Sequence, residues 1–133
     1  MKIYSWNVNG IRAVINKGAF QKFIDEANPD ILCIQETKAK KGQAEIDLPE
    51  YEEIWTDAKR PGYSGTAIFT KIKPISTKEA VFSTTKEDQY GNVLDEGRVT
   101  TLEFKNFYLI YIYLLNIHLY YHNYDINHYY IYL

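Results

Sequence analysis

Apolar residues at the start of the chain follow a strand pattern, then a helix pattern, then a second strand pattern. The segment KIYSWNV stops at the turn signal Asn9-Gly10 and predicts a buried strand over about residues 2–8. In GAFQKFIDEANP the apolar residues recur at i, i+3, i+4 and i+7, which predicts a helix that ends at Asn28-Pro29. The apolar run in DILCIQET predicts a second strand covered on both faces. Together these segments predict a β-α-β unit with a right-handed crossover.

The rest of the chain shows mostly strand patterns. We expect a charged, turn-rich connection over residues 38–61. Further strands are predicted in TAIFT (residues 66–70), EAVFST, RVTTLEF and FYLIYIYLL. The pattern therefore predicts an α/β fold with one helix near the start and a mixed sheet.

The composition suits one globular domain. The 133 residues are 46% hydrophobic and 24% charged, with a net charge of −2, which argues against disorder, collagen and a disulfide scaffold. The single Cys33 and the absence of a secretory signal pattern lead us to expect a cytoplasmic protein. No apolar run approaches the roughly 20 residues of a membrane span. The mildly acidic balance neither indicates nor excludes a polyanionic partner.

Tyrosine marks a change of composition near residue 111. Of 13 tyrosines, eight lie in residues 111–133, a stretch built only from Tyr, Ile, Leu, Asn, His and Asp. We interpret residues 1–110 as the domain and residues 111–133 as a low-complexity tail that arises from truncation or a frameshift. The three histidines of the tail could form a metal cluster with Asp125: His118, His122 and His128. A tetrahedral zinc site needs a built framework, of which the tail shows no sign, so we favour the tail interpretation.

Two polar residues follow the first two predicted strands. Asn7 ends the first strand and Glu36 ends the second. If the strands are parallel, both residues lie at the same edge of the sheet, where open α/β sheets build their sites. A carboxylate after an apolar strand needs a partner, and Mg²⁺ with its oxygen ligands is one. The alternative is that Glu36 pairs with Lys38 or only caps its strand.

Four segments in sequence order carry a family resemblance: SWNVNGIRA at 5–13, PDILCIQETK at 29–38, GYSG at 62–65 and DEGRVTTLEF at 95–104. They resemble successive motifs of the exonuclease III family of apurinic/apyrimidinic endonucleases, within the endonuclease/exonuclease/phosphatase superfamily. The resemblance implies the N-terminal part of a four-layer α/β sandwich of the DNase I-like type, a mixed sheet with helical cover. It also implies hydrolysis of double-stranded DNA at abasic sites and 3′ ends with Mg²⁺, or with Mn²⁺ in its place. We expect the protein to be a monomer that does not bind membranes.

The resemblance assigns roles to particular residues. In this family the glutamate of QET is the metal ligand, here Glu36, and the first asparagine of WNVNG, here Asn7, helps organise the metal and the scissile phosphate. Asn9 falls where some relatives carry aspartate. Four residues resemble groups that approach the DNA backbone or support the site: Arg12, Lys38, Tyr63 and Arg98. Their types suit phosphate contact.

A last family segment begins after NFYLI. Tyr113 and Asn116 fall at the offsets of an active-site tyrosine and asparagine, while Leu115 replaces a proline. Tyr113 is therefore a candidate catalytic residue and Asn116 a candidate substrate-binding residue.

Several of these residues have a structural alternative. The alternative for Arg98 is that it only forms an ion pair with Glu96 or another surface carboxylate. The alternative for Tyr63 is that it is a turn aromatic packed on the sheet. Lys40 and Lys41 fit a solvated loop better than a DNA-binding patch. Gly62 and Gly65 are expected to serve backbone geometry first.

The family's later G-D-[FL]-N and S-D-H segments, which supply the aspartates, asparagine and histidine of the hydrolytic step, have no match in this sequence. We therefore expect the chain by itself to be inactive and poorly soluble. Two other functions stay open: a phosphatase or phospholipase that acts on small phosphate esters, and a non-catalytic DNA-binding remnant.

Overall fold

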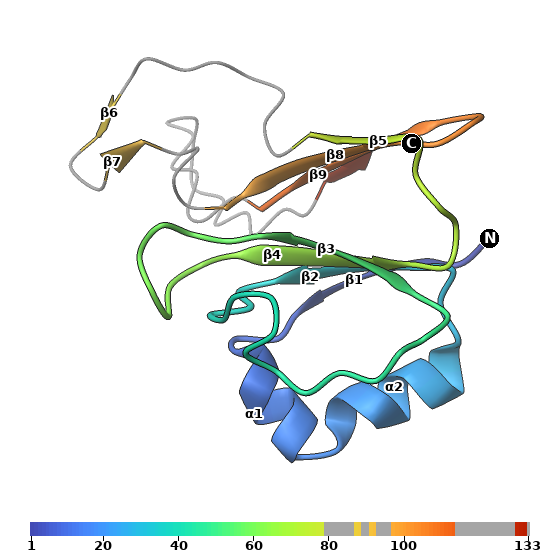
Figure 1. Cartoon of the computed structure of the whole chain (residues 1–133), viewed down its shortest axis with the longest axis horizontal. Coiled ribbons are helices and arrows are strands. Elements are labelled where there is room, and N and C mark those ends of the chain that lie inside the picture. The colour runs from blue at the N-terminus through green and yellow to red at the C-terminus, as the bar shows by residue number, and fades with distance from the viewer. Residues whose placement is uncertain (79–86, 89–90, 93–96, 114–129, 133) are drawn as a thin grey trace, which may run out of the picture.

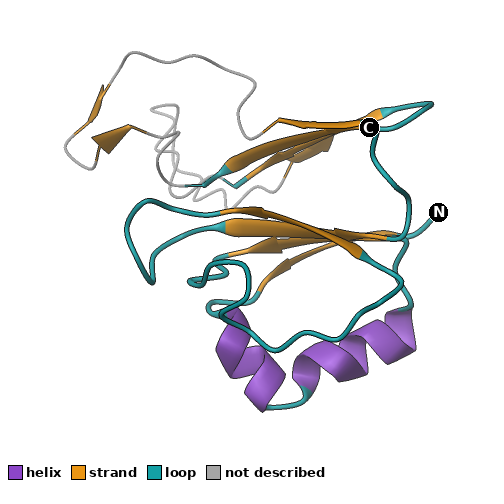
Figure 2. Ribbon diagram, viewed as in Figure 1, coloured by secondary structure: helices purple, strands orange, loops and turns teal. Residues whose placement is uncertain are grey.

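Two four-stranded sheets stack face to face, and two helices cover the outer face of the first sheet (Figures 1 and 2). The computed structural model describes residues 1–78, 87–88, 91–92, 97–113 and 130–132. Within these ranges no helix is long and apolar enough to cross a membrane. The described residues thus supply a helical layer and two sheet layers of the predicted sandwich.

The first sheet has the strand order β1-β2-β4-β3. Its strands are β1 (Ile3–Asn7), β2 (Ile31–Gln35), β3 (Glu52–Thr56) and β4 (Thr66–Thr70). β1 and β2 are parallel, with Asn7 opposite Gln35, whereas β4 runs antiparallel to both β2 and β3. The predicted parallel pair and mixed sheet are therefore confirmed. All five residues of β2 are buried, as its unbroken apolar run predicted.

The helical layer contains α1 (Ile11–Asn16) and α2 (Ala19–Ala27). The predicted amphipathic helix is α2, which buries Phe20 and Ile24 in a core cluster with Leu32 and Phe69. The sequence pattern did not predict α1. This helix has only six residues, no side-chain N-cap and a single buried residue, Ile11, so it carries too little periodicity to be detected.

The second sheet has the strand order β10-β9-β8-β5, and all its neighbouring strands are antiparallel. Its strands are β5 (Ser76–Lys78), β8 (Val99–Glu103), β9 (Tyr108–Ile112) and β10 (Tyr130–Tyr132), while β6 (Glu87–Asp88) and β7 (Gly91–Asn92) form a separate pair. The strands predicted in RVTTLEF and FYLIYIYLL correspond to β8 and β9. The strand predicted in EAVFST lies outside the described residues.

One strand, β3, falls inside the stretch that was expected to be a charged connection. It lies at the edge of its sheet and is only partly buried, so EEIWT shows no clear alternation of apolar and polar residues. The predicted division at residue 110 stays a prediction, although β10 lies beyond it.

A second core cluster joins the two sheets. Ile31, Cys33 and Ile68 from the first sheet pack with Leu102 and Leu109 from the second, and none of the five is exposed to solvent. Burial of a side chain of this size typically stabilises a fold by about 1.5–3 kcal/mol. This cluster therefore holds β8 and β9 of the second sheet against β2 and β4 of the first.

Candidate active site

The carboxyl ends of β1 and β2 bring Asn7 and Glu36 together, as predicted. Asn7 is the last residue of β1, and Glu36 directly follows β2. Asn7 Nδ2 donates a hydrogen bond to Glu36 Oε1 over 3.0 Å. The parallel pairing of the two strands produces this contact, because it places both strand ends at one edge.

Tyr113 reaches the same carboxylate from the second sheet. It follows β9, is 3% exposed, and its hydroxyl donates to Glu36 Oε1 over 2.5 Å. The Tyr113 N–H donates to the carbonyl of Arg98 (2.8 Å), and the Arg98 guanidinium lies over the Tyr113 ring, 5.2 Å from its centroid. Glu36, Tyr113 and Arg98 thus form one cluster across the two sheets.

Lys38 and Asn9 complete the cluster on the solvent side. Lys38 Nζ lies 3.1 Å from Glu36 Oε2 and also donates to Asn9 Oδ1. The Asn9 N–H donates to Asn7 Oδ1 over 3.0 Å. The alternative pairing of Glu36 with Lys38 therefore exists, and it belongs to the same arrangement that brings the predicted site residues together.

These contacts set the ionisation of Glu36. Desolvation, the largest single influence, raises its pKa, but hydrogen bonds from Tyr113, Asn7 and Lys38 and the charge of Lys38 outweigh it. The pKa of Glu36 is therefore held below its ordinary value of 4.5. The side chain is 19% exposed, so an ionised carboxylate faces the solvent edge at neutral pH.

The loop after β2 is fastened on both sides by main-chain hydrogen bonds. On one side, Gly10 N donates to Glu36 O (2.7 Å) and Ile11 N donates to Thr37 O (3.0 Å). On the other side, Thr37 N donates to Gly65 O over 3.1 Å. Glu36 has φ 52°, a left-handed conformation that costs a non-glycine residue free energy and that persists only when its surroundings enforce it.

Two of the other predicted residues, Arg12 and Tyr63, adjoin Ile11 and Ser64, whose main chains hydrogen-bond to Thr37 and Lys38. Arg12 is exposed on α1, and Tyr63 is half-buried with the Arg60 guanidinium 5.3 Å from its ring centroid. Arg98 is buried against Tyr113 rather than exposed on a surface strand. Asn116 lies outside the described residues, as do Glu96, Leu115, His118, His122, Asp125 and His128. Lys40 and Lys41 are exposed, as a solvated loop requires.

The donors at this edge fit a hard divalent cation. Glu36 offers an ionised carboxylate near solvent, and Mg²⁺ commonly takes one or two protein carboxylates while it keeps several waters. Among the residues with described positions, no three His, Cys, Asp or Glu side chains gather into a group, which argues against a zinc-type site there. Asn7 turns its amide nitrogen toward Glu36, so it orients the carboxylate in this arrangement.

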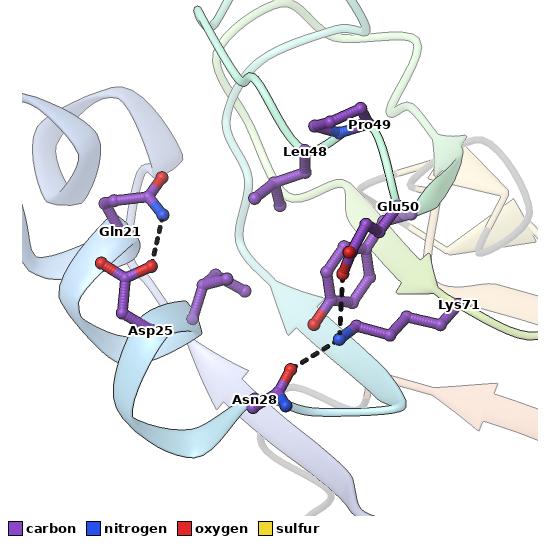
Figure 3. A pocket seen from close by; sticks show the side chains of 9 residues that line it. Gln21, Asp25, Asn28, Leu48, Pro49, Glu50 and Lys71 are labelled. Atoms are coloured by element: carbon purple, nitrogen blue, oxygen red, sulfur yellow. Dashed lines mark hydrogen bonds and ion pairs between the residues drawn. The ribbon is translucent and has the colours of Figure 1, made fainter.

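A hollow lies at the other end of the first sheet from the Glu36 cluster, between α2 and the loop before β3 (Figure 3). Its volume is about 290 Å³. Lys71 crosses it and contacts Asn28 Oδ1 (2.5 Å) and Glu50 Oε2 (3.3 Å), as the dashed lines in Figure 3 mark. The Tyr51 hydroxyl donates to Pro29 O (2.7 Å). These contacts join α2 to the loop, and the hollow is separate from the Glu36 cluster.

Comparison with known proteins gives consistent matches. The profile of the Endonuclease/Exonuclease/phosphatase family matches residues 4–132. An exodeoxyribonuclease of Bacillus subtilis is 41% identical over 116 residues, which cover 87% of this chain and 43% of that protein. A DNA-(apurinic or apyrimidinic site) endonuclease of Dictyostelium discoideum is 39% identical over 118 residues, 87% of this chain and 30% of that protein.

Solved structures agree with these matches. An AP endonuclease from Archaeoglobus fulgidus superposes with a TM-score of 0.61 at 26% identity, covering 85% of this chain and 40% of that one. The catalytic domain of Xenopus laevis APE2 gives 0.59 at 32% identity, covering 77% and 38%. The chain therefore spans less than half the length of the relatives that it matches, and the described sandwich has their α/β fold.

Proposed function

The chain belongs to the Endonuclease/Exonuclease/phosphatase family, and we propose that it is a DNA repair nuclease of the exonuclease III type. The proposed reaction is metal-dependent hydrolysis of phosphodiesters in double-stranded DNA at abasic sites and 3′ ends. The observation that carries the proposal is the Glu36 carboxylate, held by Asn7 and Tyr113 at the carboxyl ends of the parallel strands. Open α/β sheets bind ligands at such an edge.

Glu36 would hold the cation, with Asn7 and Tyr113 orienting its carboxylate. When bound, Mg²⁺ supplies positive charge that stabilises the phosphoryl oxygens in the transition state. Lys38 places a second cation 3.1 Å from Glu36 Oε2, within reach of a phosphate that approaches the same edge. Each of these groups binds the cation or the phosphate, or orients another residue. Among the described residues we assign none to the removal of a proton from water.

The choice of DNA as substrate rests on two kinds of support. The relatives are named as an exodeoxyribonuclease and as DNA-(apurinic or apyrimidinic site) endonucleases, at 39–41% identity. Around the site, Arg12, Lys38 and the Arg60–Tyr63 pair offer cationic and aromatic groups, which suit contact with a phosphate backbone. We keep Asn116 as a proposed substrate-binding residue.

Binding and cleavage should be tested separately. The purified chain is expected to bind a duplex with one abasic site more tightly in Mg²⁺ than in EDTA, and Glu36→Gln should remove that difference. Glu45→Gln, a change at an exposed carboxylate elsewhere, serves as the control. Because the hydrolytic base is unassigned, we predict that the chain alone does not incise the duplex. Incision would contradict the predicted inactivity and support the nuclease.

Hydrolysis of inositol phosphates tests the alternative that the protein is a phosphatase for small phosphate esters. Hydrolysis of these small esters together with no preference for the abasic duplex would contradict the nuclease and favour a phosphatase. DNA affinity that is the same with Mg²⁺ and with EDTA, and the same in wild type and Glu36→Gln, would favour a non-catalytic DNA-binding remnant.

A further inference from the structure

We propose that Gly65 is a positioning residue for Glu36, and that it acts through its close contact with Thr37. The inference rests on the proposed function in one respect, namely that Glu36 binds a metal ion. It assigns to the GYSG turn a role in setting the metal ligand, beyond the DNA contact proposed for Tyr63.

The contact between Gly65 and Thr37 leaves no room for a side chain. A Cβ built on Gly65 would lie 2.5 Å from Thr37 Oγ1, a separation that real Cβ atoms essentially never show. Gly65 also has φ +81°, in the left-handed region that favours glycine. Two independent constraints therefore favour glycine at this position.

Thr37 has little freedom to move away. It is 1% exposed, and its Oγ1 donates to the carbonyl of Ala39 over 3.2 Å. Its N–H donates to Gly65 O (3.1 Å), and its carbonyl accepts from Ile11 N (3.0 Å). A side chain added at Gly65 must therefore either break the Oγ1–Ala39 hydrogen bond or shift the main chain of Thr37, which two further hydrogen bonds hold.

Thr37 directly follows Glu36, so such a displacement is passed to the carboxylate. Glu36 already has the strained φ of 52° and depends on its surroundings to keep it. Its Oε1 lies 3.0 Å from Asn7 Nδ2 and 2.5 Å from the Tyr113 hydroxyl. A shift of the main chain at Thr37 would change these contacts, so the Gly65–Thr37 contact helps to set the position of the carboxylate.

The chain offers a matched control and a relieving substitution. Gly42 has φ +82° with nothing within 4 Å of a built Cβ, so Gly42→Ala carries the backbone strain of Gly65→Ala without the steric contact. Thr37→Ala removes Oγ1, after which the nearest atoms to the added Cβ are Thr56 O at 3.8 Å and Thr37 Cβ at 3.9 Å, both at ordinary contact distance.

The experiment measures Mn²⁺ affinity by electron paramagnetic resonance and amide hydrogen exchange at Thr37 and Lys38 in the full chain. Gly65→Ala is expected to weaken Mn²⁺ binding by about 10- to 100-fold, the range found when groups that orient metal ligands are removed. It should also speed exchange at Thr37 and Lys38, whose N–H groups bond to Gly65 O and Ser64 O. Gly42→Ala should do neither.

Recovery of Mn²⁺ affinity in a double variant distinguishes a positioning role of Gly65 from general destabilisation of the fold. The double variant Thr37→Ala/Gly65→Ala is expected to recover most of the lost Mn²⁺ affinity, because the added Cβ then meets no atom at short range. If Gly65→Ala alone does not fold, the double variant still tests the proposal. Because it relieves the steric contact, it is expected to fold and to bind Mn²⁺. A double variant no better than Gly65→Ala, or a Gly42→Ala as damaging as Gly65→Ala, would overturn the proposal.

The same experiment distinguishes a failure of the proposed function from a failure of the positioning role of Gly65. If the wild-type chain shows no Mn²⁺ affinity that depends on Glu36, the metal site is absent and the proposed function fails. Hydrogen exchange still tests the contact in that case: unchanged exchange in Gly65→Ala would overturn the positioning role as well.

Discussion

Tyr113 donates a hydrogen bond to Glu36 over 2.5 Å, although the two residues are 77 positions apart and belong to different sheets. Glu36 follows β2 of the first sheet, and Tyr113 follows β9 of the second. The stacking of the two sheets is thus what completes the environment of the carboxylate.

Tyr113→Phe should weaken Mn²⁺ binding by about 10- to 100-fold, the range typical of losing a group that orients a metal ligand, because Glu36 is then less firmly oriented. Electron paramagnetic resonance measures the affinity. Tyr108→Phe is the matched control, since Tyr108 also donates to a glutamate, Glu103, over 3.0 Å, but on the exposed face of the second sheet. Equal effects of the two variants would contradict a specific role for Tyr113.

Glu36 should make the free energy of unfolding depend on pH in the acidic range. Its folded-state pKa lies below the ordinary 4.5, so its stabilising contribution is fully present above about that pH and is lost as the pH falls through the lower folded value. The stability gap between wild type and Glu36→Gln should therefore narrow as urea titrations move from about pH 7 to about pH 3. A gap that stays constant over this range would show that Glu36 is not stabilised as an anion.

Gly97→Ala should destabilise the fold through the junction of the two sheets. A Cβ on Gly97 would lie 2.2 Å from Thr56 O and 2.6 Å from the carbonyl carbon of Asp57, both main-chain atoms at the end of β3. We expect a loss of about 2–3 kcal/mol or more in urea denaturation. Gly18→Ala, with φ +71° and nothing within 4 Å, isolates the backbone cost of about 1–2 kcal/mol. A smaller loss for Gly97→Ala than for Gly18→Ala would contradict the packing.

Cys33 should be inert toward thiol reagents in the native chain. It is fully buried between the two sheets, and burial raises its pKa to about 12. Because the thiolate is the reactive form, the aromatic disulfide reagent DTNB should modify Cys33 only at the rate of unfolding and quickly in urea. Rapid labelling without denaturant would show that the sheets do not cover this residue.

Lys71→Ala should leave the metal site unchanged. Lys71 lies at the opposite end of the first sheet, and its ion pair with Glu50 is exposed on the Glu50 side (75%), so its loss should change the stability of the fold little. Mn²⁺ affinity should equal that of wild type. A loss of affinity as large as that of Gly65→Ala would mean that general destabilisation alone weakens the site.

Local pattern was enough to predict much of the first sheet. The unbroken apolar run of β2 and the periodicity of α2 each report the burial of that segment alone. With the parallel crossover, they already place Asn7 and Glu36 at one edge. The same local logic failed for α1 and β3, because a six-residue helix and a half-buried edge strand carry little periodicity.

The sequence by itself therefore determined the β-α-β unit, the ordered family motifs and the identity of the candidate metal ligand. Only the tertiary structure decided that Lys38 contacts Glu36 and Asn9, that Arg98 lies against Tyr113, and that Gly65 touches Thr37. The physical reason is distance along the chain. Periodicity records which face of one element is buried, whereas contacts between separate loops depend on how the two sheets stack and on the register of their strands.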